Sequence, residues 1–94
     1  MKPTKFKIGA YPNPFNAQIT LKLHLDAPER LTLRILDIQG RERATLAQSE
    51  FQAGDYTFQW NGEDSDGIPV NSGVYLFQVI GQQSAAVYKI TVIK

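Results

Sequence analysis

The sequence predicts an all-β fold, an antiparallel β-sandwich of about seven strands. Apolar and polar residues alternate through most of the chain, which is the period of a strand with one buried face. Clusters of glycine, proline, asparagine and aspartate interrupt this alternation at intervals of about 8–12 residues. Because strands this short each bury mainly one face, two sheets must share one core, with the sheets about 10 Å apart.

The alternation also places the individual strands. The clearest predicted strands are residues 19–25, 31–35, 56–60, 74–80 and 87–93. In residues 74–80 the second face is also largely apolar. Residues 41–48 have a weaker pattern, and we interpret them as a short strand that ends in a loop. No segment has a convincing helical period.

The length and composition fit one folded domain. The 94 residues allow a single core, which we assign to residues 5–94, with residues 1–4 as a linker in front of a domain excised from a larger protein. Ten basic and nine acidic residues are scattered along the chain, so no basic stripe for nucleic acid is present. The sequence has no cysteine for disulfides and no apolar run as long as a membrane span.

Five aromatic residues fall at a spacing of two on the predicted strands. They are Tyr56, Phe58, Trp60, Tyr75 and Phe77. Such spacing marks the buried face of a strand, and a tryptophan between two sheets is common in β-sandwiches. We therefore predict that these rings form the core. The alternative, a sugar-binding platform, requires Trp60 to be exposed.

The proline segment (residues 11–16) carries two prolines one residue apart, Pro12 and Pro14. Each proline fixes its own φ and favours an extended predecessor. Neither can donate a hydrogen bond to a strand ladder, so the segment is predicted to enter or border a sheet. Tyr11 and Phe15, near its two ends, are interpreted as apolar anchors.

Turn residues separate the strands. Asp37 and Gly40 have the spacing of a type I turn followed by a left-handed residue, and Asp64 and Gly67 repeat it. In the second turn, Asp64 and Asn61 are expected to bond backbone amides. The full set of predicted turn residues is Asp37, Gly40, Asn61, Gly62, Asp64, Asp66, Gly67 and Gly73.

No residue pattern predicts catalysis or a cofactor. Calcium at Asp64 and Asp66 is the alternative to turn chemistry, but an EF-hand register centred on Gly67 puts Gly62 in the first ligand position. The acidic residues share one polar turn, whereas a glycosidase pair must face across a cleft. The one histidine, His24, occupies the polar face of a predicted strand. The domain is therefore predicted not to be an enzyme.

Four stretches carry a resemblance to a known family: residues 11–16, 33–41, 60–67 and 70–75. In order and spacing they resemble the Ig-like C-terminal modules of exported bacterial proteins. These modules are the type A sorting domains of the type IX secretion system and the similar Ig-like domain of the flagellar hook-capping protein. Residues 17–18 depart from the Pro-Ser or Pro-Thr often found there, and the 60–67 loop is more similar to the hook-capping variant.

The resemblance implies an Ig-like, non-catalytic sorting or surface-attachment module, recognised as a folded domain by the outer-membrane secretion machinery. It implies export to the outside or outer-membrane surface of a Gram-negative-type bacterium, with other protein domains as partners and a monomeric state. The recognition residues would be Tyr11, Pro12, Asn13, Pro14, Phe15, Asn16, Tyr88, Lys89 and Lys94. The alternatives are a passive structural or assembly domain, as in the hook-capping protein, and a carbohydrate-binding module.

Overall fold

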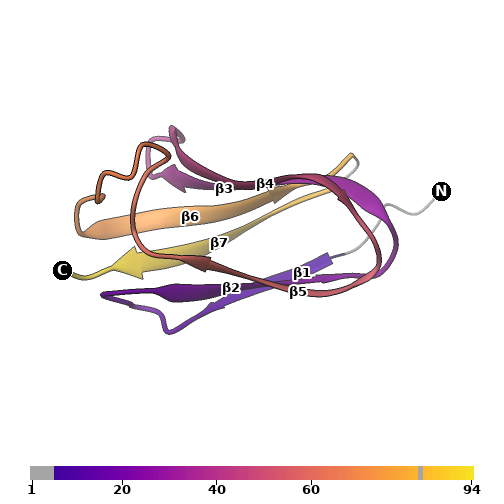
Figure 1. Cartoon of the computed structure of the whole chain (residues 1–94), viewed down its shortest axis with the longest axis horizontal. Helices are drawn as coiled ribbons and strands as arrows, with labels where there is room; N and C mark the ends of the chain where they lie inside the picture. The colour runs from indigo at the N-terminus through magenta and orange to yellow at the C-terminus, as the bar shows by residue number, and fades with distance from the viewer. Residues whose placement is uncertain (1–5, 83) are drawn as a thin grey trace.

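Two antiparallel sheets pack face to face in the computed structural model, which describes residues 6–82 and 84–94 (Figure 1). The strands there are β1 (Phe6–Tyr11), β2 (Ile19–Leu25), β3 (Glu29–Asp37), β4 (Glu42–Phe51), β5 (Gly54–Trp60), β6 (Gly73–Ile80) and β7 (Ala85–Val92). One sheet has the order β1-β2-β5 and the other the order β4-β3-β6-β7. The predicted all-β sandwich is confirmed. The predicted linker, residues 1–4, lies outside the described residues.

The core lies between the sheets and is built from the alternating residues. In β2, the inward side chains of Ile19, Leu21, Leu23 and Leu25 are at most 1% exposed, whereas Lys22 faces solvent. The inward residues of β3, β6 and β7 meet them from the other sheet. Within the described residues no helix is formed, and thus none that is long and apolar enough to cross a membrane.

The aromatic residues divide between the core and its margin. Those that are buried are Trp60, Tyr75 and Phe77. Tyr56 and Phe58 are only half-buried because β5 is the edge strand of its sheet. Their rings pack against Phe51, with centroid distances of 5.0 and 6.1 Å. Trp60 is 3% exposed, so the platform that a carbohydrate-binding module needs is missing at this position.

β4 is longer than the sequence pattern predicts. It continues to Phe51 instead of ending in a loop after residue 48. Its pairing with β3 shifts register twice, and at one shift Leu33 pairs with Ala47 while Arg34 pairs with Thr45. An extra residue at each bulge changes which side chains face inward. The bulges therefore disrupt the apolar–polar alternation from which a strand is recognised in sequence.

Candidate recognition site at the proline segment and the last strand

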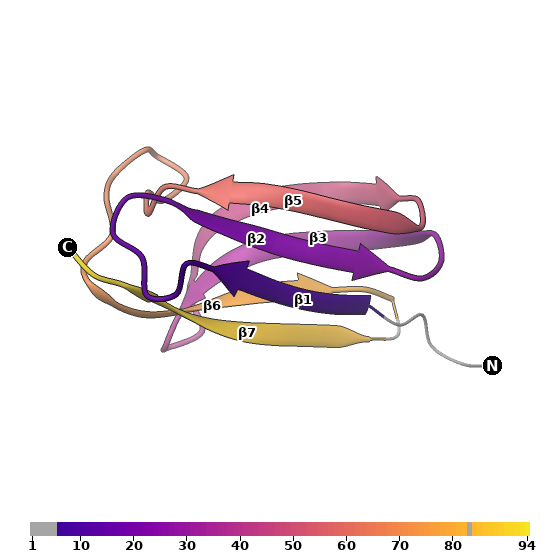
Figure 2. The same cartoon turned by 90° about the horizontal axis from the view of Figure 1, so that it is seen from below.

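The proline segment lies along the free edge of β7 and is hydrogen-bonded to it. Asn13 Nδ2 donates to the Lys89 carbonyl oxygen at 3.0 Å, and Asn13 Oδ1 accepts from the Thr91 amide at 2.9 Å. The Phe15 amide donates to the Thr91 carbonyl oxygen at 3.0 Å, and the Phe15 carbonyl oxygen accepts from the Ile93 amide at 2.8 Å. The chain thus leaves β1 in one sheet and crosses to the edge of the other (Figure 2).

The two prolines determine which groups of the segment can pair. Pro12 and Pro14 have no amide hydrogen, so a continuous ladder with β7 is impossible. Phe15 pairs through its backbone, while Asn13 pairs through its side-chain amide, which donates one hydrogen bond and accepts one as a backbone residue does. The interpretation of this segment as the border of a sheet agrees with its position. Both prolyl peptide bonds are cis.

Phe15 anchors the segment in the core. It is 3% exposed, and its ring centroid lies 5.7 Å from that of Trp60, which in turn lies 5.9 Å from that of Tyr75. Trp60 Nε1 donates to the Glu63 carbonyl oxygen at 2.8 Å, and the Tyr75 hydroxyl donates to the Asn71 carbonyl oxygen at 2.8 Å. The same aromatic cluster therefore holds both the proline segment and the loop between β5 and β6.

Tyr11 is not a buried anchor, contrary to the sequence-based interpretation. Its side chain is 54% exposed, because residue 11 falls on the outward face of the edge strand β1. The ammonium group of Lys22 lies 5.6 Å from the Tyr11 ring centroid, a distance at which a cation–π attraction operates.

One end of the sandwich carries the proline segment, the C-terminus and the loop between β5 and β6 (Figure 2). Of the six large apolar residues exposed in the described part of the chain, four belong to this end: Tyr11, Ile38, Ile68 and Ile93. A shallow hollow runs between the proline segment and the end of the chain, and Pro12, Pro14 and Ile93 help to line it. We call this surface the loop end.

The other predicted recognition residues are distributed differently. Asn16 is exposed beside the hollow. Lys89 and Lys94 are also exposed, and the Lys94 amide donates to Ser72 Oγ at 2.9 Å. Tyr88 faces inward and packs against the core, so its side chain lies away from the loop end.

The two aspartate turns have the same hydrogen bonds. Asp64 Oδ1 accepts from the amides of Asp66 and Ile68, both at 2.9 Å, and Gly67 adopts φ 80°. In the other turn, Asp37 Oδ1 accepts at 2.9 and 3.0 Å from the amides two and four residues on, and Gly40 adopts φ 85°. The remaining predicted turn glycines, Gly62 and Gly73, adopt φ 78° and 150°.

Asn61 differs from its prediction. Its side-chain amide donates to the Glu63 carboxylate at 3.2 Å rather than bonding a backbone amide. Glu63 thus accepts two hydrogen bonds from residues shortly before it, one at its carbonyl oxygen from Trp60 and one at its carboxylate from Asn61.

The aspartate turns lie side by side. The Ser65 amide donates to the Arg43 carbonyl oxygen at 3.0 Å, and Arg41 and Arg43 border the same hollow as Asp64 and Asp66. Among the residues that the structure describes, no three histidine, aspartate or glutamate side chains gather as metal ligands.

Asp37 is the partly enclosed carboxylate of this region. Arg41 Nε donates to Asp37 Oδ2 at 3.0 Å, and Arg43 Nη1 lies 3.9 Å from the same oxygen. Burial acts to raise the pKa of Asp37, but hydrogen bonds from the Arg41 amide, the Arg41 guanidinium and the Gln39 amide outweigh it and lower the pKa. Asp37 therefore remains ionised and holds the turn between β3 and β4.

A cluster around His24 is absent from the sequence-based expectations. His24 Nδ1 lies 2.7 Å from Asp55 Oδ1, and His24 Nε2 lies 2.9 Å from Asp26 Oδ1. The hydrogen bond to Asp55, followed by that to Asp26, raises the pKa of His24. Asp26 follows His24 by two residues, so the sequence contains that half of the cluster. Asp55 is brought in only by the pairing of β2 with β5.

Comparisons of the sequence with known proteins match the bacterial protein FlgD. A family model described as the FlgD Ig-like domain matches residues 14–85. The basal-body rod modification protein FlgD of Salmonella typhimurium is 40% identical over 47 residues, which make up 50% of this chain and only 20% of that protein.

The solved structures that match include two proteins of Porphyromonas gingivalis and FlgD. PorZ, described as a bacterial surface component of the type IX secretion system of Porphyromonas gingivalis, is 28% identical with a TM-score of 0.62, over 93% of this chain and 11% of PorZ. Latent PorU of Porphyromonas gingivalis has a TM-score of 0.78 at 15% identity, over 99% of this chain and 10% of PorU. FlgD of Xanthomonas campestris has a TM-score of 0.61 at 17% identity, over 92% of this chain and 65% of FlgD.

At 15% and 17% identity, the likenesses to PorU and to the Xanthomonas protein concern the fold alone. The family match, by contrast, extends from Pro14 at the loop end to the beginning of β7. It includes both aspartate turns and the strand that carries Trp60. The chain belongs to the FlgD Ig-like domain family.

Proposed function

We propose that this domain is a non-catalytic recognition module of an exported bacterial protein. In this role it directs sorting, or attachment at the cell surface, because the outer-membrane secretion machinery binds it as a folded domain. The site of action is outside the cell or at the outer-membrane surface, the domain acts as a monomer, and no cofactor takes part.

The observation that carries the proposal is the joining of the proline segment to the last strand. Asn13 and Phe15 lie far from Thr91 in the sequence, and their hydrogen bonds make one surface of the two segments. A partner that contacts both segments can therefore bind only the folded domain. That is the property expected of a signal that is read after folding.

The chemistry of the loop end also suits a protein partner. Tyr11, Ile38, Ile68 and Ile93 are each more than half exposed, and Pro12 and Pro14, which share a hollow with Ile93, stiffen the segment that follows Tyr11. Clusters of exposed apolar residues on a small domain mark interaction surfaces, and a stiff surface loses little conformational entropy on binding. The 28% identity to PorZ adds support for a role in type IX secretion.

A fusion experiment with matched surface variants tests the proposal. The domain is fused to the C-terminus of a periplasmic reporter in a bacterium with a type IX system. Ile93→Ser changes a residue at the loop end that is 51% exposed, and Val87→Ser changes one on the outer face of β7 that is 52% exposed. Both variants should fold. We expect Ile93→Ser alone to leave the reporter in the periplasm, whereas equal export of the two variants would contradict a role for the loop end.

The second candidate is a structural domain within an extracellular assembly, as in the hook-capping protein. It is favoured by the family membership and by the 40% identity to Salmonella FlgD. The parent gene discriminates between the two roles. A signal peptide with a catalytic domain upstream supports sorting, whereas a flagellar operon supports assembly. In the second case the fusion above stays in the periplasm with or without the loop-end residues.

A further inference from the structure

The free edge of β5 runs along the side of the sandwich that lies opposite β1 and β7 (Figure 2). β5 pairs with β2 on one side, and within residues 6–82 and 84–94 no strand pairs with its other side. In an antiparallel strand every second residue directs its amide and carbonyl groups away from the partner strand, so about half of the backbone groups of β5 point out from this edge. The edge is separate from the proline segment, and an interaction here goes beyond the proposed function.

The other edge strands, β1, β4 and β7, each have a feature that hinders pairing with a further strand. The edge of β7 is bound by Asn13 and Phe15. β1 carries Lys7 and ends just before Pro12, and β4 is interrupted by two bulges. β5, by contrast, pairs with β2 without a register shift and contains no lysine, arginine or proline. It is therefore the edge at which a further strand is least hindered.

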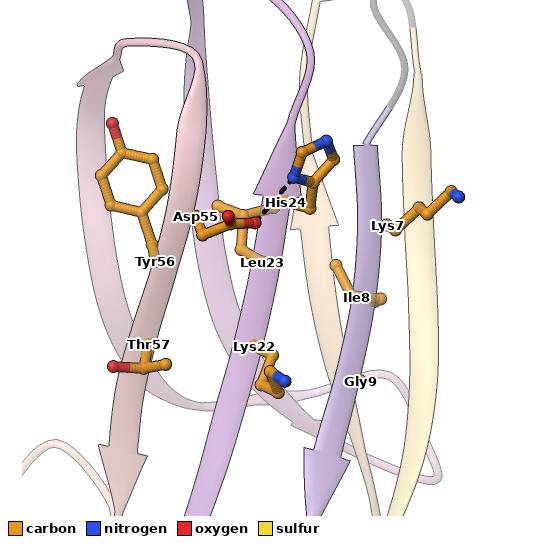
Figure 3. A pocket seen from close by; sticks show the side chains of 9 residues that line it. All are labelled: Lys7, Ile8, Gly9, Lys22, Leu23, His24, Asp55, Tyr56 and Thr57. Atoms are coloured by element: carbon orange, nitrogen blue, oxygen red, sulfur yellow. Dashed lines mark hydrogen bonds and ion pairs between the residues drawn. The ribbon is translucent and has the colours of Figure 1, made fainter.

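The side chains beside this edge determine which strand fits it. Tyr56 and Phe58 pack against the core but are only half-buried, so part of each ring is still in contact with solvent. Figure 3 shows Tyr56 and the Thr57 hydroxyl on the side of β5 that faces away from β2. A strand added on that side covers the exposed part of the two rings when its own inward side chains are apolar.

Asp55 supplies the charge on the outward face of β5. It is the one charged residue of this strand, and its side chain is 85% exposed although Oδ1 lies 2.7 Å from His24 Nδ1. Opposite charges on neighbouring strands attract each other, and like charges repel. The position beside Asp55 in an added strand is therefore suited to lysine or arginine and unsuited to an acidic residue.

We propose that β5 binds an extended segment of another protein, which becomes a fourth strand of the β1-β2-β5 sheet. The segment has apolar side chains at alternate positions, which contact Tyr56 and Phe58, and a basic side chain beside Asp55. Backbone hydrogen bonds to the free edge hold the segment, and the alternate side chains determine which segments bind.

A synthetic peptide as long as β5 tests this proposal. In the peptide valine alternates with threonine, and one lysine takes the position that faces Asp55 in the antiparallel register. NMR titration of the labelled domain should show saturable shifts of the amides of residues 54–60, with slower hydrogen exchange at alternate residues among them. The amides of residues 89–92 should not respond, because the proline segment already binds that edge.

Two N-methylated peptides make the test specific for backbone pairing. One carries methyl groups on the amides of its valines, and the other carries them on the amides of its polar residues. Alternate amides of a strand face opposite edges, so only one of these two sets faces β5. One methylated peptide should therefore lose binding, whereas the other should bind as the unmodified peptide does.

Charge variants test the contribution of Asp55. Glutamate in place of the lysine of the peptide should weaken binding about fivefold, which corresponds to about 1 kcal/mol for one exposed charge pair. Asp55→Asn should remove this difference between the two peptides. Glu50→Gln is the matched control, since Glu50 is an exposed acid on β4 in the other sheet, and it should leave the difference unchanged.

Several results would overturn the proposal. Shifts that never saturate, or equal binding of the two N-methylated peptides, would exclude backbone pairing at a defined site. Equal responses of residues 54–60 and 89–92 would mean that the peptide binds strand edges in general. Concentration-dependent shifts of residues 54–60 in the domain alone would identify a second copy of the chain as the occupant instead. None of these measurements involves export, so failure here is distinct from failure of the proposed function.

Discussion

The side-chain oxygen of Asn13 accepts the backbone amide of Thr91 at 2.9 Å, although the two residues are 78 positions apart. Asn13 Nδ2 also donates to the Lys89 carbonyl oxygen. The edge of β7 is therefore hydrogen-bonded to a side chain at this point, where a sheet would place another strand. An exposed strand edge invites pairing with other chains, and a proline-rich cover prevents it. The proline segment therefore stabilises the domain and also forms part of the loop-end surface.

Asn13→Ala removes both hydrogen bonds and should lower the free energy of unfolding by about 1–2 kcal/mol, because water replaces only part of them at this exposed position. Chemical denaturation measures the change. Asn16→Ala, at a neighbouring exposed asparagine, is the matched control and should change the stability by less than about 0.5 kcal/mol. Equal effects of the two substitutions would show that the contacts with β7 do not stabilise the fold.

Trp60→Ala should lower the free energy of unfolding by about 3–5 kcal/mol, since the side chain is 3% exposed and contacts Phe15 and Tyr75. Trp60→Phe retains a ring but loses the hydrogen bond to the Glu63 carbonyl oxygen, and it should have a smaller effect. Thermal and chemical unfolding give both values. A loss below about 1 kcal/mol for Trp60→Ala would contradict the packing of this residue in the core.

The sequence was sufficient for the sandwich where alternation is regular, as in β2, whose inward leucines follow a period of two without interruption. It was insufficient at β4, because two bulges shift the inward face within the strand. β1 has no clear alternation either, since its inward residues Phe6, Ile8 and Ala10 are only half-buried and the outward Gly9 between them is half-buried too. Periodicity thus identifies strands in proportion to how uniformly one face is buried.

The candidate site was accessible from the sequence only in part. The two prolines and the aspartate-to-glycine spacing are local patterns, so the turns at Asp37 and Asp64 could be predicted from short-range rules. The pairing of Asn13 with β7 and of His24 with Asp55 depends on strand register, which no local pattern contains. The exposure of Tyr11 followed from the same register, because one position decides which face a side chain occupies.

Gly67→Val should destabilise the domain by about 1–2 kcal/mol, because a β-branched residue is strained at φ 80°. The hydrogen bonds from the backbone amides of Asp66 and Ile68 to Asp64 Oδ1 fix that conformation, so the loop cannot relax easily. Thermal unfolding detects the change. Gly9→Val, with no positive φ and no nearby atom, is the control, and its melting temperature should be unchanged or higher. Equal melting temperatures for Gly67→Val and the original domain would contradict the assigned turn.

The pairing of His24 with Asp55 and Asp26 should make stability depend on pH near neutrality. The folded-state pKa of His24 is raised above its usual 6.5, so between the two values the folded state binds more protons than the unfolded state. The stabilisation is fully present below about pH 6.5 and is lost as the pH rises through the folded pKa. Unfolding measured from pH 5.5 to 8.5 should show this decrease in the original domain, and His24→Gln should remove it. The C2-proton NMR signal of His24 reports the pKa directly, and a midpoint at or below 6.5 would exclude the effect.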